Sequence, residues 1–427
     1  MKPCIHCFLF LFLFAASSST AQIVNPQKML EGKMIKKTNQ AIDKKTDAAI
    51  DSLLLDKTNS GPVEKTQNTG IKQETAAQTD TAVAVTQKQE SVLQTYSKFD
   101  FVAGERVIFY DDFSQDNVGD LPVAWNTNGS AEIVTNNLYD GHWMQVISRN
   151  SVWTEALLNL PENYTIEFDI IPIKGEDAGM AGYHFRLMQS INEKSFDPGS
   201  VPGKAGFQFK CEYFGRPGYS TYINGNEGQG LALSGVKEDK NLFEKINQKY
   251  HISIWVQKSR IRLYQNETKL FDLPKAFPVS TVKMDRIRFE DGAALISNVR
   301  IAIGNPDMRS KLLTEGKLVT YGIYFDVNKD VVKPESYGTL KSIADVLSEN
   351  PSVRIKIVGH TDADGNAAAN LDLSKRRAAA VKNELTGNFG IDASRMEIDG
   401  KGAAQPVAPN DNSTNKALNR RVEFIKL

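Results

Sequence analysis

The pattern of hydrophobic and polar positions changes twice along the 427 residues of the chain. Up to residue 97, apolar residues form one unbroken run and then a weakly helical spacing. From 98 to 306, they alternate with polar residues in short runs between turn residues, which indicates β-strands. From 315 onward, strand-like runs alternate with helix-like runs. The pattern predicts a multidomain chain in which a β-sandwich precedes an α/β domain.

The first 21 residues have the pattern of a signal peptide. A basic start at residues 1–3 precedes the apolar run Phe8–Ala16, and the small residues Ser19 and Ala21 suit a cleavage site after Ala21. The run is shorter than the roughly 20 residues that a membrane-spanning helix needs. We therefore expect an exported chain.

The three cysteines do not support a disulfide framework. Cleavage would remove Cys4 and Cys7, and Cys211 would remain alone. We expect the Cys211 side chain to be a small buried apolar group.

Residues 22–97 have the composition of a tether. No aromatic residue or histidine occurs from Ala15 to Thr95, so the stretch cannot form a sizeable core. Ile35, Ile42 and Ala49 fall seven apart, which fits a short coiled coil or a solitary amphipathic helix. A polar, low-complexity run follows, and we expect a flexible linker there.

Residues 98–306 hold all four tryptophans and many short strand patterns. Tyr164–Ile170 and His251–Gln257 both alternate, and Arg260–Tyr264 with Lys269–Asp272 has the pattern of a hairpin. Many short strands between turns predict a sandwich or a barrel.

The ends of this block resemble laminin-G/concanavalin-like jelly rolls. The resemblance rests on Phe109–Phe113, on Gly119–Pro122 with Trp125, and on the closing run Ser297–Ile301. It implies a jelly-roll module that binds a carbohydrate or an envelope protein, and some related domains bind calcium.

Two sets of side chains in this block could bind a ligand. Trp143 and Trp153 could form a platform for a glycan, although buried core positions are the commoner use of tryptophan. Asp111, Asp112 and Asp116 could ligate a cation through oxygen atoms, but we interpret them as turn-forming residues and predict no metal site.

Two alternatives for this block stay open. An outer-membrane β-barrel would also alternate, but the irregular stretch Gln189–Gly235 and strands shorter than about 9–11 residues favour the soluble sandwich. A glycan hydrolase is the other alternative, although the sequence places no two acids at a glycosidase distance. Because no catalytic motif occurs, we predict a non-enzymatic protein without a cofactor.

The last block, residues 315–427, predicts the order βαβαβ(α)β. The predicted strands and helices are strand Leu318–Asp326, a helix from Lys333, strand Val353–Gly359, a helix over residues 366–385, and strands Met396–Gly400 and Arg421–Ile425.

Spaced motifs in this block resemble the OmpA-like peptidoglycan-binding domain. They are Gly359-His-Thr-Asp362, then Asn370-x-x-Leu373-Ser-x-x-Arg377-Ala-x-x-Val381, and Asn419-Arg-Arg-Val422. The resemblance implies a noncovalent anchor to peptidoglycan in a Gram-negative-type envelope, in the periplasm or associated with the outer membrane. It also implies that Asp362 and Arg377 bind the diaminopimelate of the stem peptide.

The chemistry of these residues fits that ligand. Diaminopimelate ends in an ammonium and a carboxylate on one carbon, and arginine can bind a carboxylate through two parallel hydrogen bonds. On a helix, Asn370, Leu373 and Arg377 share one face, beside Asp362. The resemblance also implies that Arg420 contributes to this site. Asp364, which follows Asp362 in the same turn, is a further candidate. The alternative interpretation is a purely structural salt bridge between Asp362 and Arg377.

The overall charge of the chain limits which class of partner it can bind. Lysine and arginine number 51, and aspartate and glutamate also number 51. A net charge of zero argues against a nucleic-acid partner, since such proteins carry a cationic surface.

Overall fold

The computed structural model describes residues 99–427 except residues 148, 175–181, 197–200, 212, 225–229, 278–281 and 305–306. The predicted signal peptide and tether lie outside the described residues. All described residues belong to one compact unit, Val92–Leu427. Within this part of the chain, no helix combines the length and the apolar character that crossing a membrane would require.

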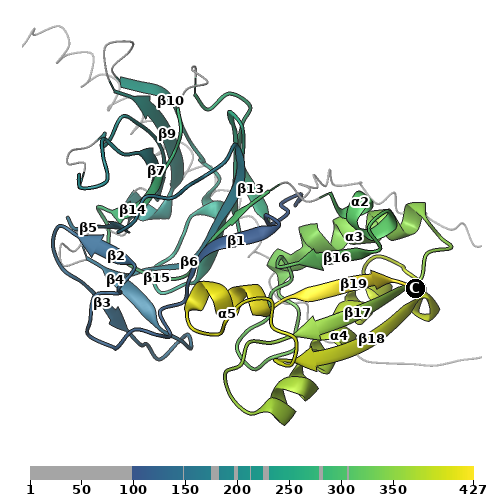
Figure 1. Cartoon of the computed structure of the whole chain (residues 1–427). Coiled ribbons are helices and arrows are strands. Elements are labelled where there is room, and N and C mark those ends of the chain that lie inside the picture. Colours follow the sequence, from purple (N-terminus) through teal and green to yellow (C-terminus); the bar gives the residue numbers. More distant parts are fainter. Residues whose placement is uncertain are drawn as a thin grey trace, which may run out of the picture. The chain divides into compact units, whose positions relative to one another are not determined.

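Residues 106–303 form two antiparallel sheets, shown in Figure 1. The first has the order β13-β12-β11-β6-β15-β4-β3, with β1 also paired to β15. Its strands are β1 Arg106–Asp111, β3 Ala131–Val134, β4 Trp143–Val146, β6 Asn163–Pro172, β11 Tyr250–Gln257, β12 Arg260–Gln265, β13 Thr268–Leu273 and β15 Ala294–Ile303.

The second sheet has the order β10-β9-β8-β7-β14-β5-β2. Its strands are β2 Trp125–Thr127, β5 Ser151–Thr154, β7 Tyr183–Gln189, β8 Ala205–Cys211, β9 Pro217–Ile223, β10 Gly230–Val236 and β14 Arg286–Glu290. Two 3₁₀ turns, η1 Tyr213–Gly215 and η2 Lys240–Leu242, lie between strands.

One apolar core holds the two sheets together. Phe168 of β6 and Phe185 of β7 stack with their ring centroids 5.0 Å apart, and Phe289 of β14 meets Phe168 edge-on at 5.0 Å. Since these rings come from opposite sheets and are buried, the sheets face each other. We call residues 106–303 the sandwich. The jelly-roll connectivity stays a prediction.

The hairpin prediction holds in detail. Strands β12 and β13 pair with a two-residue loop, Asn266 and Glu267, and Asn266 has a φ of 49°. Asparagine tolerates this left-handed conformation, which short hairpin loops require. Cys211 is buried, as its isolation in the sequence suggested.

A layer of buried charged groups lies outside that core. Glu167 and Asp169 alternate with the core residues of β6, yet both are almost fully buried. Arg300 donates to Glu167 at 2.6 Å, and His251 lies 2.7 Å from Asp169. Burial alone would lower the pKa of His251, but its hydrogen bonds to Asp169 and Glu167 raise it to about 10.

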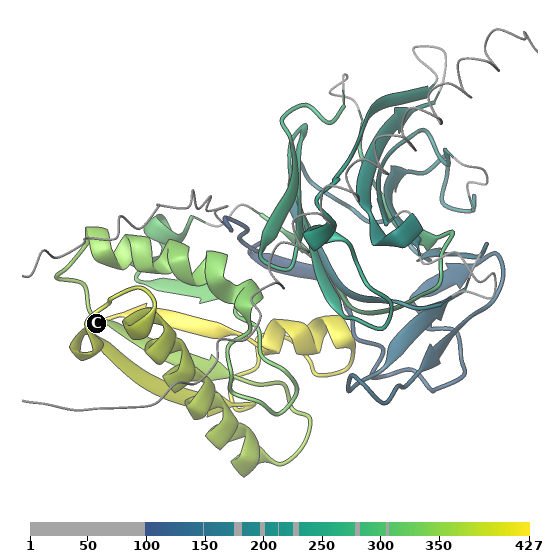
Figure 2. The ribbon, with the colours of Figure 1, turned by 180° about the vertical axis from the view of Figure 1, so that it is seen from behind.

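The C-terminal domain, residues 308–427, is a four-stranded sheet with helices. The strand order is β16-β19-β17-β18, in which β17 and β18 run parallel. Figure 2 shows α3 and α4 crossing the same face of this sheet. The elements are α2 Met308–Leu313, β16 Lys317–Thr320, η3 Pro334–Ser336, α3 Tyr337–Glu349, β17 Ile355–His360, α4 Ala367–Gly387, η4 Ala393–Arg395, β18 Met396–Gly402, α5 Ser413–Asn419 and β19 Val422–Lys426.

This order agrees with the predicted alternation, but two boundaries differ by more than two residues. The first strand ends at Thr320 rather than Asp326, because the chain leaves the sheet and forms only an isolated bridge between Phe325 and Val332. Buried apolar residues Met308 and Leu312 of α2 also belong to this core, so the core begins before residue 315.

Candidate ligand-binding site

Asp362 lies just beyond the end of β17. The Thr361 N–H donates to the Gly402 carbonyl at 3.0 Å and so continues the β17–β18 pairing up to this point. The Asp362 carboxylate accepts from Arg420 Nη1 at 2.7 Å and from the Asp364 N–H at 3.1 Å. Its side chain is 13% exposed, so one carboxylate in a sheltered position remains reachable from solvent.

The loop after Asp362 is held by side chains that point back into it. Asn370 of α4 is buried, and its Nδ2 donates to the Asp364 carbonyl at 2.8 Å. Asn366 caps α4 by accepting from the Ala368 N–H at 2.8 Å. The Asp364 carboxylate pairs with Lys416 at 2.9 Å. Asn370 and Asp364 therefore shape the loop that presents Asp362.

Arg377 reaches the site from the middle of α4. Its Nε donates to the Lys329 carbonyl at 2.9 Å, and Nη2 donates to the Asp326 carbonyl at 3.1 Å. The guanidinium lies 4.8 Å from the centre of the Phe325 ring. Burial and the charge of Arg420 lower the pKa of Arg377 to about 10, against the opposing effect of Asp362.

Arg420 provides the second cation of the site. Asp362 is its ion-pair partner. Burial alone would lower the pKa of Arg420, but its neighbours Tyr110, Asp112 and Asp362 raise it overall. The next residue, Arg421, pairs instead with Glu423 at 2.9 Å.

The sequence-predicted residues come together, though not all in the same role. Asp362, Arg377 and Arg420 lie close enough for their charges to interact, and no ion pair between Asp362 and Arg377 occurs among the described residues. Leu373 is buried, as is Asn370. The net charge of the three ionised side chains is positive, which suits a ligand that carries a carboxylate. Lys416, which holds the loop at Asp364, was not foreseen.

The sandwich tryptophans differ in what they offer. Trp143 is 2% exposed and packs beside Ile171 and Leu295, so its ring face has no room for a sugar. Trp153 is also buried, but it stacks with Phe196 at 6.5 Å and borders a surface cavity.

The cavity beside Trp153 has a volume of about 880 Å³. Two almost fully buried arginines hold one of its walls: Arg286 Nη2 donates to the Glu193 carbonyl at 2.8 Å, and Arg288 Nη1 donates to the Phe196 carbonyl at 3.1 Å. The other described residues at its edge are Asn126, Thr127, Asn128, Glu155, Ala156, Lys194 and Ser195.

The aspartates of the first loop act as turn residues. Asp111 accepts from the Phe113 N–H at 3.0 Å and from Trp125 Nε1 at 2.9 Å. Asp112 accepts from the Ser114 N–H, and Asp116 accepts from the Val123 N–H. Burial raises the pKa of Asp111 to about 6.

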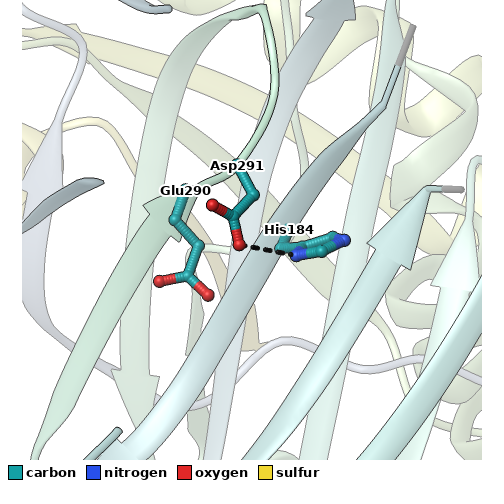
Figure 3. A group of neighbouring side chains, drawn as sticks. All are labelled: His184, Glu290 and Asp291. Atoms are coloured by element: carbon teal, nitrogen blue, oxygen red, sulfur yellow. Dashed lines mark ion pairs between the residues drawn. The ribbon is translucent and has the colours of Figure 1, made fainter. Parts of the chain in front are cut away.

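A second set of potential metal ligands, His184, Glu290 and Asp291, lies on the sandwich (Figure 3). His184 Nδ1 and Asp291 Oδ2 point toward each other at 3.3 Å. Glu290 is buried and pairs with both Arg186 and Arg288. Because two guanidinium groups already neutralise Glu290 and would repel a dication, we interpret the group as part of an ion-pair network.

Comparison with known proteins defines the class of the C-terminal domain. Residues 324–420 match the model of the OmpA family. The matched span includes Asp362, Arg377 and Arg420. The C-terminal region is therefore an OmpA-like domain, as its motifs suggested.

Named relatives match over the same region. Outer membrane porin F of Pseudomonas fluorescens is 43% identical over 105 residues, which are 25% of this chain and 32% of that protein. The probable lipoprotein YiaD of Escherichia coli is 40% identical over 102 residues, 24% of this chain and 46% of that protein. The chain thus spans less than half the length of these relatives.

Among solved structures, the peptidoglycan-associated lipoprotein of Burkholderia pseudomallei is 31% identical. The match covers 25% of this chain and 88% of that chain, with a TM-score of 0.23.

Proposed function

We propose that the C-terminal domain anchors the chain noncovalently to peptidoglycan by binding the diaminopimelate of the stem peptide. The observation that carries the proposal is the grouping of Asp362, Arg377 and Arg420 without an ion pair between Asp362 and Arg377 in the described structure. Asp362 would accept hydrogen bonds from the ligand ammonium. Arg377 would bind the carboxylate on the same carbon.

The OmpA-like domain and the relatives named for the outer membrane support a place in a Gram-negative-type envelope. In this proposal, the chain is exported to the periplasm or the outer membrane and acts as a structural anchor rather than as an enzyme. The sandwich would then be displayed at the wall.

The test is sedimentation of the full chain with purified sacculi. We expect the protein to sediment with diaminopimelate-type sacculi and to be released by an excess of soluble diaminopimelate stem peptide. A lysine-type stem peptide is the matched control, because lysine has the ammonium but lacks the second carboxylate. Equal release by both peptides would contradict the assignment of Arg377 to the ligand carboxylate.

We further propose that the sandwich binds a carbohydrate in the cavity beside Trp153. Sugars need hydrogen-bonding groups and an apolar surface. The cavity supplies the hydrogen-bonding groups through the amides of Asn126 and Asn128 and the carboxylates of Glu155 and Glu193. The half-exposed Phe196 ring supplies the apolar surface.

Affinity electrophoresis of the full chain in gels that contain xylan, mixed-linkage β-glucan or mannan tests the cavity. We expect at least one polysaccharide to retard the protein and Phe196→Ala to lose most of that retardation. Leu138→Ala, which truncates an exposed apolar side chain outside the cavity, is the control. No retardation by any polysaccharide would contradict the proposal. Release of reducing ends would favour the hydrolase alternative.

A further inference from the structure

The sandwich contacts the C-terminal domain beside Arg420. The Tyr110 N–H of β1 donates to Thr414 Oγ1 of α5 at 2.9 Å, and the Thr414 hydroxyl lies 3.3 Å from the Tyr110 carbonyl. Both residues belong to the compact unit Val92–Leu427. Helix α5 ends immediately before Arg420, so this contact fixes β1 next to the start of β19.

Groups from both domains surround the Arg420 guanidinium. Nη1 donates to Asp362 of the C-terminal domain at 2.7 Å. The guanidinium lies 4.9 Å from the centre of the Tyr110 ring, and Nη2 lies 3.8 Å from Asp112 Oδ2. The last distance is too long for a hydrogen bond. Nη2 is buried and has no hydrogen-bond acceptor among the described residues. A small shift of the guanidinium would let a ligand oxygen or Asp112 accept from it.

The two sandwich residues at Arg420 are themselves fixed. The Tyr110 hydroxyl donates to Asn298 Oδ1 at 2.8 Å, and Asn298 Nδ2 donates to the buried Asp169 at 2.9 Å. Asp112 Oδ1 accepts from the Ser114 hydroxyl at 2.7 Å, which leaves Oδ2 facing Arg420. The ring and the carboxylate are therefore held in place before any ligand arrives.

A second contact braces the other arginine. The Tyr324 hydroxyl donates to the buried Glu167 of the sandwich at 2.6 Å, and Arg300 donates to the same hydroxyl at 3.3 Å. The next residue, Phe325, lies under the Arg377 guanidinium at 4.8 Å. The segment that begins at Tyr324 also supplies both carbonyls that bind Arg377. The sandwich thus reaches both cations of the site.

We propose that strand β1 of the sandwich and the residue that follows it, Asp112, complete the stem-peptide site, with Tyr110 and Asp112 as positioning residues that hold Arg420 between them and Asp362. The inference rests on the proposed function of the C-terminal domain and assigns part of that site to a different domain. Because Tyr110 covers one face of the guanidinium, Arg420 keeps its planar orientation when the ligand carboxylate approaches. Affinity for the wall then depends on the sandwich remaining docked.

The test measures the affinity of the full chain for a soluble diaminopimelate stem peptide by calorimetry. We expect Tyr110→Leu to weaken binding roughly three- to thirtyfold, which is the range of a cation–π contact. Tyr110→Phe keeps the ring and should stay within about twofold of wild type. Thermal unfolding of each variant is recorded in parallel. A merely structural Tyr110 would lower the unfolding temperature of the leucine variant without changing the affinity of its folded fraction.

If Tyr110→Leu does not fold, Asp112→Lys takes its place. Asp112 is partly exposed, and an ammonium there would repel Arg420 and compete with the ligand for Asp362, so weaker binding is expected. Wild-type affinity in folded Tyr110→Leu or folded Asp112→Lys would overturn the inference while leaving the proposed function intact, provided that Arg377→Ala still loses binding. Failure of the wild-type protein to bind the peptide would overturn both.

Discussion

We expect Arg377→Ala to lower the affinity for a diaminopimelate stem peptide on the order of 100-fold. This is the largest effect on binding that we predict. Truncating one partner of a sheltered, hydrogen-bonded charge pair typically costs 2–5 kcal/mol or more, and every 1.4 kcal/mol is tenfold in affinity. The loss should fall on the carboxylate end of the ligand. The variant should therefore bind diaminopimelate and lysine stem peptides almost equally.

Arg377→Lys separates charge from geometry. The lysine keeps a cation near the site but cannot form two parallel hydrogen bonds to a carboxylate. It also loses the contacts to the carbonyls of Lys329 and Asp326 that aim the guanidinium. We expect this variant to bind more weakly than wild type by roughly tenfold and to retain part of the preference for diaminopimelate.

Arg376→Ala is the matched control for both variants. Arg376 precedes Arg377 on α4, is 47% exposed, and pairs with Asp330 and Asp372 on the surface. Such surface pairs contribute little to stability, so near wild-type binding and stability are expected. Calorimetry with both peptides provides the measurement. Binding by Arg377→Ala within twofold of wild type would exclude Arg377 as a ligand residue.

The parts of the site that the sequence predicted are those set by local rules. Asn366 was expected at the start of the long helix, and it caps α4. Asn370 and Arg377 fall seven residues apart, nearly two full turns, so helix periodicity alone placed them on one face. Asp362 followed a strand with clear alternation and lies just beyond the end of β17. Short-range sequence patterns were sufficient in each case.

What the sequence did not reveal depends on contacts between distant segments. Alternation along β6 assigns Glu167 and Asp169 to the face away from the core, but nothing local shows that Arg300 and Tyr324 cover that face. The partner of Asp362 was expected to be Arg377 if the pair were structural, yet Arg420, which is 58 residues away, forms the ion pair. Only the docking of α5 on β1 could have revealed that the Tyr110 ring lies against Arg420.

A buried carboxyl group outside the ligand site, Glu244, gives the second large predicted effect, which is on the pH dependence of stability. Glu244 is buried against the sandwich core and accepts from the Tyr183 hydroxyl at 2.9 Å. Burial raises the pKa of Glu244 to about 8, although its hydrogen bonds with Tyr183 and Cys211 oppose this shift. The folded protein therefore holds a proton on Glu244 at neutral pH, whereas the unfolded chain, with a normal carboxyl pKa, does not.

The sign of the pH dependence follows from this difference in bound protons. Between the unfolded value of 4.5 and the folded value of about 8, unfolding releases a proton from Glu244. The free energy of unfolding then falls by about 1.4 kcal/mol for each unit of pH, and the loss stops above the folded pKa. Across the window, Glu244 is expected to cost the folded state about 3–5 kcal/mol.

Glu244→Gln should remove this cost, because glutamine keeps an acceptor for the Tyr183 hydroxyl and does not ionise. We expect the variant to match wild type within about 1 kcal/mol at pH 5 and to be more stable by several kcal/mol at pH 9. Urea unfolding of both proteins across this range measures the difference. His251, whose raised pKa makes its stabilising contribution fade as the pH rises from 6.5 toward 10, is present in both proteins, so its effect cancels. A difference in unfolding free energy that stays constant from pH 5 to pH 9 would show that Glu244 ionises normally in the folded protein.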